Sequence, residues 1–206
     1  MITVKKFIKQ LNNTELGKGS THDTYILIPQ DVSIKGIFDR TENWIAFKDS
    51  AGGESIDLKN TEGREKRIVG LGEYYRRNDL AAGDEIILQR IVSGDDESFI
   101  VGFQKYENCL TIQRFKDNFE ILTESKLPMA QKWSEIAEGF SIEYLREEHK
   151  RSDSPETTSL YRVLVGGKNI AGKYKNKDMI ILKLQGNKVL EWKSTGWKQI
   201  EFEMEG

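Results

Sequence analysis

Short apolar segments separated by turn signals recur about every 8 to 12 residues up to residue 115, and this spacing most strongly restricts the fold. In the segment 43–50, Ile45 and Phe47 share one face of an extended strand, and Trp44 lies on the other. The segment 53–60 alternates in the same way, and the sequence AGG between the two segments indicates a hairpin turn. The pattern predicts a β-barrel or a β-sandwich.

Two short helices are expected within this β-rich part of the chain. The segment 29–38 begins with Pro29, which is favourable in the first turn of a helix. The segment 72–79 reads as a second helix and precedes a turn at AAGD. The remaining strands are expected at residues 24–29, 66–72, from Glu85 onward, 98–105 and 109–115.

The chain changes character after residue 120. Apolar residues between Met129 and Phe140 recur at helical spacing after Pro128, which predicts one longer helix. The polar segment 151–159 resembles a linker, and a second group of alternating segments follows it. We therefore expect one domain over residues 1–120 and a C-terminal α+β extension or small second domain over residues 121–206. An alternative is that the last strands return to the first sheet.

Charge and composition exclude several classes of function. The net charge of −2 argues against binding nucleic acid through bulk positive charge alone. A single cysteine rules out a disulfide framework and a cysteine-based zinc site, and the two histidines, His22 and His149, are far apart. No secretory signal is recognisable, and no run approaches the roughly 18 apolar residues needed to span a bilayer. We expect a cytoplasmic protein that has no membrane partner and no cofactor.

Two charged, glycine-bearing loops each precede a predicted strand. The first loop covers residues 15–23, and the second covers residues 59–67. The second concentrates Arg64, Glu65, Lys66 and Arg67, so it offers donors and acceptors together. Arginine and lysine can donate to guanine, and a carboxylate can accept from the cytosine amino group. The alternative interpretation is an exposed strand end with local ion pairs, each worth about 0–1 kcal/mol.

Two longer segments carry a resemblance to a known family. The sequences LGKGSTHDTYILIPQDV (16–32) and EKRIVGLGEYYRRNDLAAGDEIILQR (65–90) resemble the two halves of the B-three-like DNA-binding pseudobarrel. That domain occurs in plant transcription factors and, with greater similarity, in the recognition (effector) domains of restriction endonucleases such as EcoRII and BfiI. The resemblance implies a mainly β, seven-stranded open pseudobarrel with two short helices. It also implies that the aromatic residues of the helix at 72–79 pack on the barrel rather than stack on single-stranded bases.

The resemblance further implies sequence-specific binding of double-stranded DNA through two arms in the major groove. It assigns His22 to the first arm and Glu65, Lys66 and Arg67 to the second. The chain would be the recognition part of a bacterial or archaeal restriction–modification system, with the nuclease domain or subunit elsewhere and no catalysis here. The resemblance does not predict the short DNA sequence that is bound, because Gly63 stands where the EcoRII arm has an arginine. The candidate DNA-binding residues are Lys18, Ser20, Thr21, His22, Asp23, Lys59, Asn60, Arg64, Glu65, Lys66 and Arg67.

Two other functions are compatible with the sequence. Asp178 followed by Glu191 and Lys193 matches the loose pattern of PD-(D/E)xK nucleases, in which two carboxylates hold Mg²⁺ and a lysine orients the attacking water. Any alternating strand with a glutamate and a lysine satisfies this pattern. The second alternative is a barrel that binds another protein.

Overall fold

The computed structural model describes residues 1–205 and confirms a mainly β protein. It divides into two compact units. The first contains Met1–Lys105 together with the residues from Thr195 onward, and the second contains Tyr106–Ser194. Among the described residues, no helix is long and apolar enough to cross a membrane.

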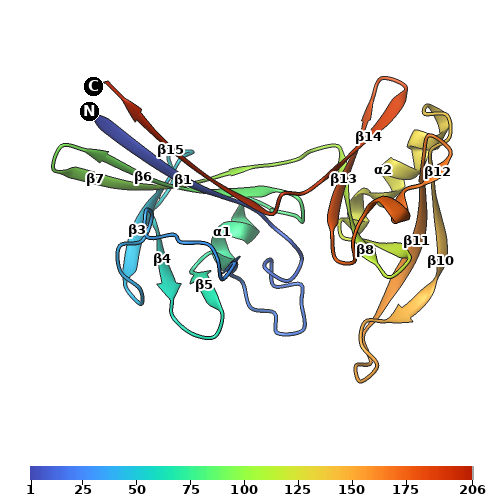
Figure 1. Ribbon diagram of the computed structural model, residues 1–206, viewed down its shortest axis with the longest axis horizontal. Coiled ribbons are helices and arrows are strands. Elements are labelled where there is room, and N and C mark those ends of the chain that lie inside the picture. Colours follow the sequence, from blue (N-terminus) through green and yellow to red (C-terminus); the bar gives the residue numbers. More distant parts are fainter. Residues whose placement is uncertain (206) are drawn as a thin grey trace. The chain divides into compact units, whose positions relative to one another are not determined.

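The first unit is built on a curled, open sheet of eight strands in the order β15-β1-β6-β7-β3-β4-β5-β2 (Figure 1). Neighbouring strands are antiparallel except β3 and β7, which are parallel. This confirms the expected open pseudobarrel, with one strand more than the expected seven. The strands are β1 (Ile2–Gln10), β2 (Ile26–Ile28), β3 (Trp44–Asp49), β4 (Ile56–Thr61), β5 (Lys66–Val69), β6 (Glu85–Ser93), β7 (Asp96–Gln104) and β15 (Trp197–Met204).

Alternation places the core of this unit on one face of each strand. Phe47 on β3 and Leu58 on β4 are fully buried, whereas Trp44 is exposed, as the pattern predicts. Helix α1 (Gly72–Arg77) buries Tyr74 and Tyr75 against the same core. This agrees with core packing of the two tyrosines rather than with a role in base stacking.

The segment 29–38 does not form the expected helix. It makes successive turns instead, with hydrogen bonds from the Val32 N–H to the Pro29 carbonyl and from the Phe38 N–H to the Ile34 carbonyl. Val32, Ile34, Ile37 and Phe38 are all buried. The turns direct these side chains into the core, and this burial outweighs the weak helical tendency of so short a segment.

The second unit contains a separate sheet in the order β10-β11-β9-β8-β13-β14, with β12 paired to β11. Its core includes Leu110, Phe119, Trp133, Val163 and Ile180. The elements are β8 (Cys109–Phe115), β9 (Asn118–Ile121), η1 (Glu124–Lys126), α2 (Leu127–Gln131), η2 (Lys132–Glu135), β10 (Ser141–His149), β11 (Thr157–Val165), β12 (Lys168–Asn169), η3 (Ile170–Lys173), β13 (Met179–Gln185) and β14 (Lys188–Lys193).

The unit boundaries differ from the expected division at residue 120. Strands β8 and β9 belong to the second sheet, and β15 pairs with β1 along eight residue pairs, so the chain enters the second unit at Tyr106 and leaves it at Ser194. The alternative, in which the final strands return to the first sheet, is therefore right for β15 alone. Strand pairing between distant segments decides this division, and local sequence patterns do not report it.

The long helix expected after Pro128 is also wrong. Only short helical turns form up to Glu135, and strand β10 follows. Gly139 has a φ of +75°, and a Cβ there would lie 2.5 Å from the backbone nitrogen of Gly167, so the chain turns where a helix would continue. Of the predicted linker at 151–159, residues 151–156 form the turn between β10 and β11, closed by a hydrogen bond from the Lys150 N–H to the Glu156 carbonyl, and residues 157–159 already belong to β11.

Candidate nucleic-acid interface

The two charged loops flank one short ladder of strands. We call residues 15–23 the first arm and residues 59–67 the second arm. The first arm leads into β2, the second arm leads into β5, and these strands pair antiparallel from Ile26–Ile68 to Ile28–Lys66. Because the strands run in opposite directions, the arms approach this ladder from its two ends. Three residue pairs span only about 7 Å along a strand. The two arms are therefore close enough to act on one ligand.

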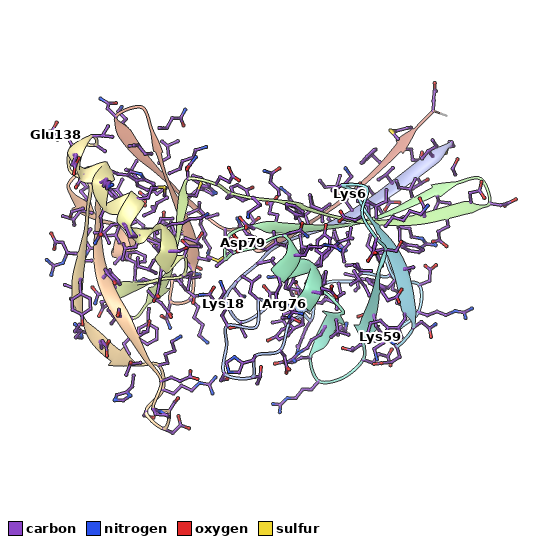
Figure 2. The ribbon with its side chains drawn as sticks, turned by 180° about the vertical axis from the view of Figure 1, so that it is seen from behind. Lys6, Lys18, Lys59, Arg76, Asp79 and Glu138 are labelled. Atoms are coloured by element: carbon purple, nitrogen blue, oxygen red, sulfur yellow. The ribbon has the colours of Figure 1, made fainter. Side chains whose placement is uncertain are left out.

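Both arms lie on one side of the unit. In Figure 1 the long strands β1, β6, β7 and β15 run above, and the loop between β4 and β5 projects downward, with the first arm on the same lower side. Figure 2, seen from behind, places Lys18 and Lys59 on this lower side and Lys6 among the long strands above. The open sheet thus presents both arms to the same face.

Glu15 anchors the first arm. Its side chain is only 1% exposed, and one carboxylate oxygen accepts hydrogen bonds from Lys9 Nζ at 2.9 Å and from the Asn12 N–H at 3.2 Å. The other oxygen accepts from the Leu27 N–H at 2.9 Å. A buried carboxylate with an ion pair and two backbone donors is well satisfied. Glu15 therefore fixes the start of the arm to both β1 and β2.

The tip of the first arm is exposed and tightly turned. Lys18, Ser20, Thr21, His22 and Asp23 are all exposed, as the candidate set requires. The arm is closed by hydrogen bonds of the Lys18 N–H to Asn13 and of the His22 N–H to Gly19. His22 has a φ of +55°, and its ring Nδ1 lies 3.4 Å from the Gly17 carbonyl oxygen. The backbone thus holds five polar side chains outward on a compact loop.

Arg67 and Glu65 form a unit at the end of the second arm. Arg67 Nη2 donates to Glu65 Oε2 at 2.6 Å, and this hydrogen bond raises the pKa of the arginine. The guanidinium also lies 4.1 Å from the ring centroid of Tyr25, which directly precedes β2. Burial raises the pKa of the Tyr25 hydroxyl, and the nearby Arg67 opposes that effect. The carboxylate of Glu65 is thereby held in place, yet it stays more than half exposed.

Three arm cations keep their charge available. Within the described residues, Lys18, Arg64 and Lys66 have no ion-pair partner, and all three are exposed. Unpaired cations beside a fixed carboxylate give the arms both signs of charge. This arrangement provides donors for phosphate or guanine together with an acceptor for an amino group.

The structure does not group Lys59 and Asn60 with these exposed side chains. Lys59 pairs with Glu42 at 3.1 Å, and its Nζ lies 5.2 Å from the centroid of the Trp44 ring. A backbone hydrogen bond from Glu62, followed by that from Lys59, lowers the pKa of Glu42 and keeps this partner charged. Asn60 is 7% exposed and faces inward on β4. Lys59 is therefore already neutralised, and Asn60 cannot reach a ligand at the arm tips.

Several residues that shape the arms were not anticipated from the sequence. The ring of Tyr25 contacts the guanidinium of Arg67, and the Tyr75 hydroxyl donates to the Tyr25 carbonyl oxygen at 3.3 Å. Glu15 was grouped with the first loop but without a role. For Glu15 and Tyr25 the only signal in the sequence was their proximity to the predicted strand 24–29, which does not distinguish an anchor from a surface residue.

The residues of the nuclease alternative lie near one another in the second unit but pair separately. Lys193 Nζ lies 2.8 Å from Asp178 Oδ1, whereas Glu191 pairs with Lys173 and accepts from the Tyr174 hydroxyl at 3.0 Å. Burial opposes ionisation of Asp178, but hydrogen bonds from Lys193 and the Lys175 N–H outweigh it and lower its pKa. Over residues 1–205, no three acidic, histidine or cysteine side chains are placed to hold a metal ion.

No model of a known protein family matches the chain, and no curated protein matches it.

Proposed function

We propose that the first unit binds double-stranded DNA sequence-specifically, with the two arms in the major groove. The observation that carries the proposal is the β2–β5 ladder, which joins an exposed arm at each of its ends. A major groove about 12 Å wide admits protein elements of this size. The resemblance of both arm regions to the recognition domains of restriction endonucleases supports the same function.

Some arm residues suit contacts that position the protein on the DNA backbone, and others suit contacts that read the DNA bases. Lys18 and Arg64 are exposed and unpaired within the described residues, so they suit phosphate contacts that set the register. Glu65 is exposed and held by Arg67, so it suits the amino group of cytosine, while Lys66 suits guanine. His22 and its polar neighbours would read the other half of the site.

In this proposal the chain is the recognition part of a restriction endonuclease and acts with a nuclease domain or subunit. A cytoplasmic location in a bacterium or archaeon belongs to the same proposal. The paired lysines at Asp178 and Glu191 give no specific support to a nuclease site in the second unit.

Selection from a randomised duplex library, read by gel shift at low salt, tests the proposal. We expect enrichment of one short sequence by the intact chain and loss of that enrichment in a Glu65→Ala, Arg67→Ala double variant. Lys6→Ala is a matched control, because Lys6 is a cation of the same unit that lies among the long strands, away from the arms (Figure 2). Absence of any enriched sequence at low salt would reject DNA recognition and favour the protein-binding alternative. Mg²⁺-dependent cleavage that Lys193→Ala abolishes would instead establish the nuclease alternative.

A further inference from the structure

A cavity of about 720 Å³ opens behind the second arm. Its walls come from the turns at 32–43 and from the end of β4 with the residues that follow it. Ile34 and Phe38 contribute buried apolar surface, whereas Asn60 and Thr61 contribute polar groups. The volume lies within the roughly 300–1,000 Å³ of typical small-molecule sites.

The walls of this cavity are joined by hydrogen bonds. The Glu42 N–H donates to the Asn60 carbonyl at 2.7 Å, and the Glu62 N–H donates to Glu42 Oε1 at 2.8 Å. The Thr41 hydroxyl donates to Glu62 Oε1 at 2.7 Å. These bonds connect the turn segment to the second arm, so the cavity is formed before any ligand arrives.

Asn60 supplies a polar group that the protein leaves without a partner. Its side chain lies on the inward face of β4, the same face as Leu58, and the residue is 7% exposed. Its Oδ1 is buried and accepts no hydrogen bond from any described residue. Buried side-chain amides in folded proteins are nearly always paired, so this unpaired amide in the wall of the cavity offers a hydrogen-bonding group to a ligand. An amide pairs well with a flat group that carries both a donor and an acceptor.

The mouth of the cavity carries excess positive charge. Lys35, Arg40 and Lys66 line it, and none of them has an ion pair within residues 1–205. The two carboxylates there are engaged, since Asp39 pairs with Arg90 at 2.6 Å and Glu62 accepts from Thr41. Three unpaired cations at the mouth suit a phosphate group.

We propose that this cavity holds a single nucleotide. The base would lie against Ile34 and Phe38 with its edge at the Asn60 amide, and the phosphate would lie among Lys35, Arg40 and Lys66. A free nucleotide and a nucleotide extruded from a duplex share this chemistry. Only the extruded nucleotide rests on the proposed DNA binding, because it requires a bound duplex. Lys66, which belongs to the second arm and also lines the cavity, would connect the two sites.

Two measurements separate these sources. The first titrates each deoxynucleoside monophosphate into the ¹⁵N-labelled chain, with inorganic phosphate alone as the comparison. The second places the fluorescent base 2-aminopurine at each position of the selected duplex and follows its emission on binding. We expect nucleotide-induced shifts in residues 32–43 and 59–66, or enhanced emission at one position of the duplex.

Variants give the decisive comparison. Asn60→Leu keeps the size of the side chain and removes the amide, and we expect it to weaken the nucleotide signal at least tenfold. Arg40→Gln alters only an exposed residue, so it tests the mouth if Asn60→Leu does not fold; we expect severalfold weaker binding. Lys6→Ala should leave free-nucleotide binding unchanged, because Lys6 does not line the cavity.

The outcomes distinguish this inference from the proposed function. Specific duplex binding without any nucleotide shift or 2-aminopurine signal would reject the nucleotide site and leave the arms intact. Nucleotide binding without duplex binding would reject the proposed function and support the site. Shifts produced equally by inorganic phosphate, or signals unchanged in both Asn60→Leu and Arg40→Gln, would overturn the inference.

Discussion

The buried carboxylate of Glu15 accepts a hydrogen bond from the backbone N–H of Leu27 at 2.9 Å, across the whole first arm. The same carboxylate pairs with Lys9 on β1. Strand β2 lies at the end of the sheet order, so its outer backbone groups lack a neighbouring strand. Glu15 supplies the missing acceptor there, and one side chain closes the arm at both ends.

We therefore expect Glu15→Ala to destabilise the protein by about 3–5 kcal/mol, because it leaves Lys9 buried and unpaired. Glu15→Gln should destabilise it less, since the amide oxygen can still accept one bond. Urea unfolding followed by circular dichroism gives both values. Glu54→Ala is the control, because Glu54 is exposed, and its unfolding midpoint should not change. A Glu15→Ala variant as stable as the control would refute the anchoring role.

Gly70, just after β5, is expected to be intolerant of any side chain. Its φ is +105°, and a Cβ would lie 2.2 Å from the Asp57 carbonyl oxygen. Gly52 has a similar φ of +83° but nothing within 4 Å of a Cβ. Gly52→Ala should therefore lower the free energy of unfolding by only the roughly 1–3 kcal/mol that backbone strain costs, whereas Gly70→Ala should lower it clearly more. Equal melting temperatures for the two variants would contradict the clash.

Arg67→Ala tests the base-reading unit of the second arm. If the proposed DNA binding is correct, the variant should lose about 1–3 kcal/mol of affinity and relax specificity at the base pair that Glu65 reads. The loss follows because Arg67 fixes the Glu65 carboxylate at 2.6 Å. Fluorescence anisotropy with single-substitution duplexes measures it. An equal loss for every sequence would assign Arg67 to phosphate contact instead.

Lys18→Ala tests a phosphate contact on the first arm. We expect it to weaken all duplexes similarly and to reduce the slope of affinity against salt by about one, because it removes one unpaired exposed cation. Affinity measured at several salt concentrations gives the slope. Behaviour indistinguishable from Arg67→Ala would count against the division of roles between the arms.

Two buried tyrosines predict loss of stability in alkali. Burial raises the pKa of Tyr74 and of Tyr75 above 10, and the Asp49 carboxylate adds to the effect at Tyr74. Below pH 10 both hydroxyls are neutral in the folded and unfolded chain, so their contribution is complete. Above pH 10 the unfolded chain ionises first, and the free energy of unfolding falls as pH rises.

Unfolding at pH 7 to 11 measures this fall, and absorbance at 295 nm reports tyrosinate. Tyr74→Phe should reduce the alkaline loss, while phenylalanine at the exposed Tyr144 should not. A fall of equal size in wild type and Tyr74→Phe would show that other groups cause it.

The sequence alone determined the elements whose pattern is local. Alternation located β3 and β4, and the AGG turn joined them. The two charged loops were found before the segments that form β2 and β5. These features depend on residues only a few positions apart, so the spacing of apolar residues along the chain indicates them directly. Helix α1, expected from the local pattern, and its inward tyrosines, expected from the family resemblance, agree with the structure as well.

Only the tertiary structure decided which distant segments pair and which polar side chains stay free. Strand β15 joins the first sheet through pairs such as Ile2–Met204, so the residues from Thr195 onward return to the first unit. The pairing of β8 with β13 places the other boundary at Tyr106 instead of residue 120. The same long-range packing pairs Lys59 with Glu42 and places Asn60 in the wall of a cavity. A charged or amide side chain looks the same in sequence whether it is exposed or paired, because its partners come from elsewhere in the chain.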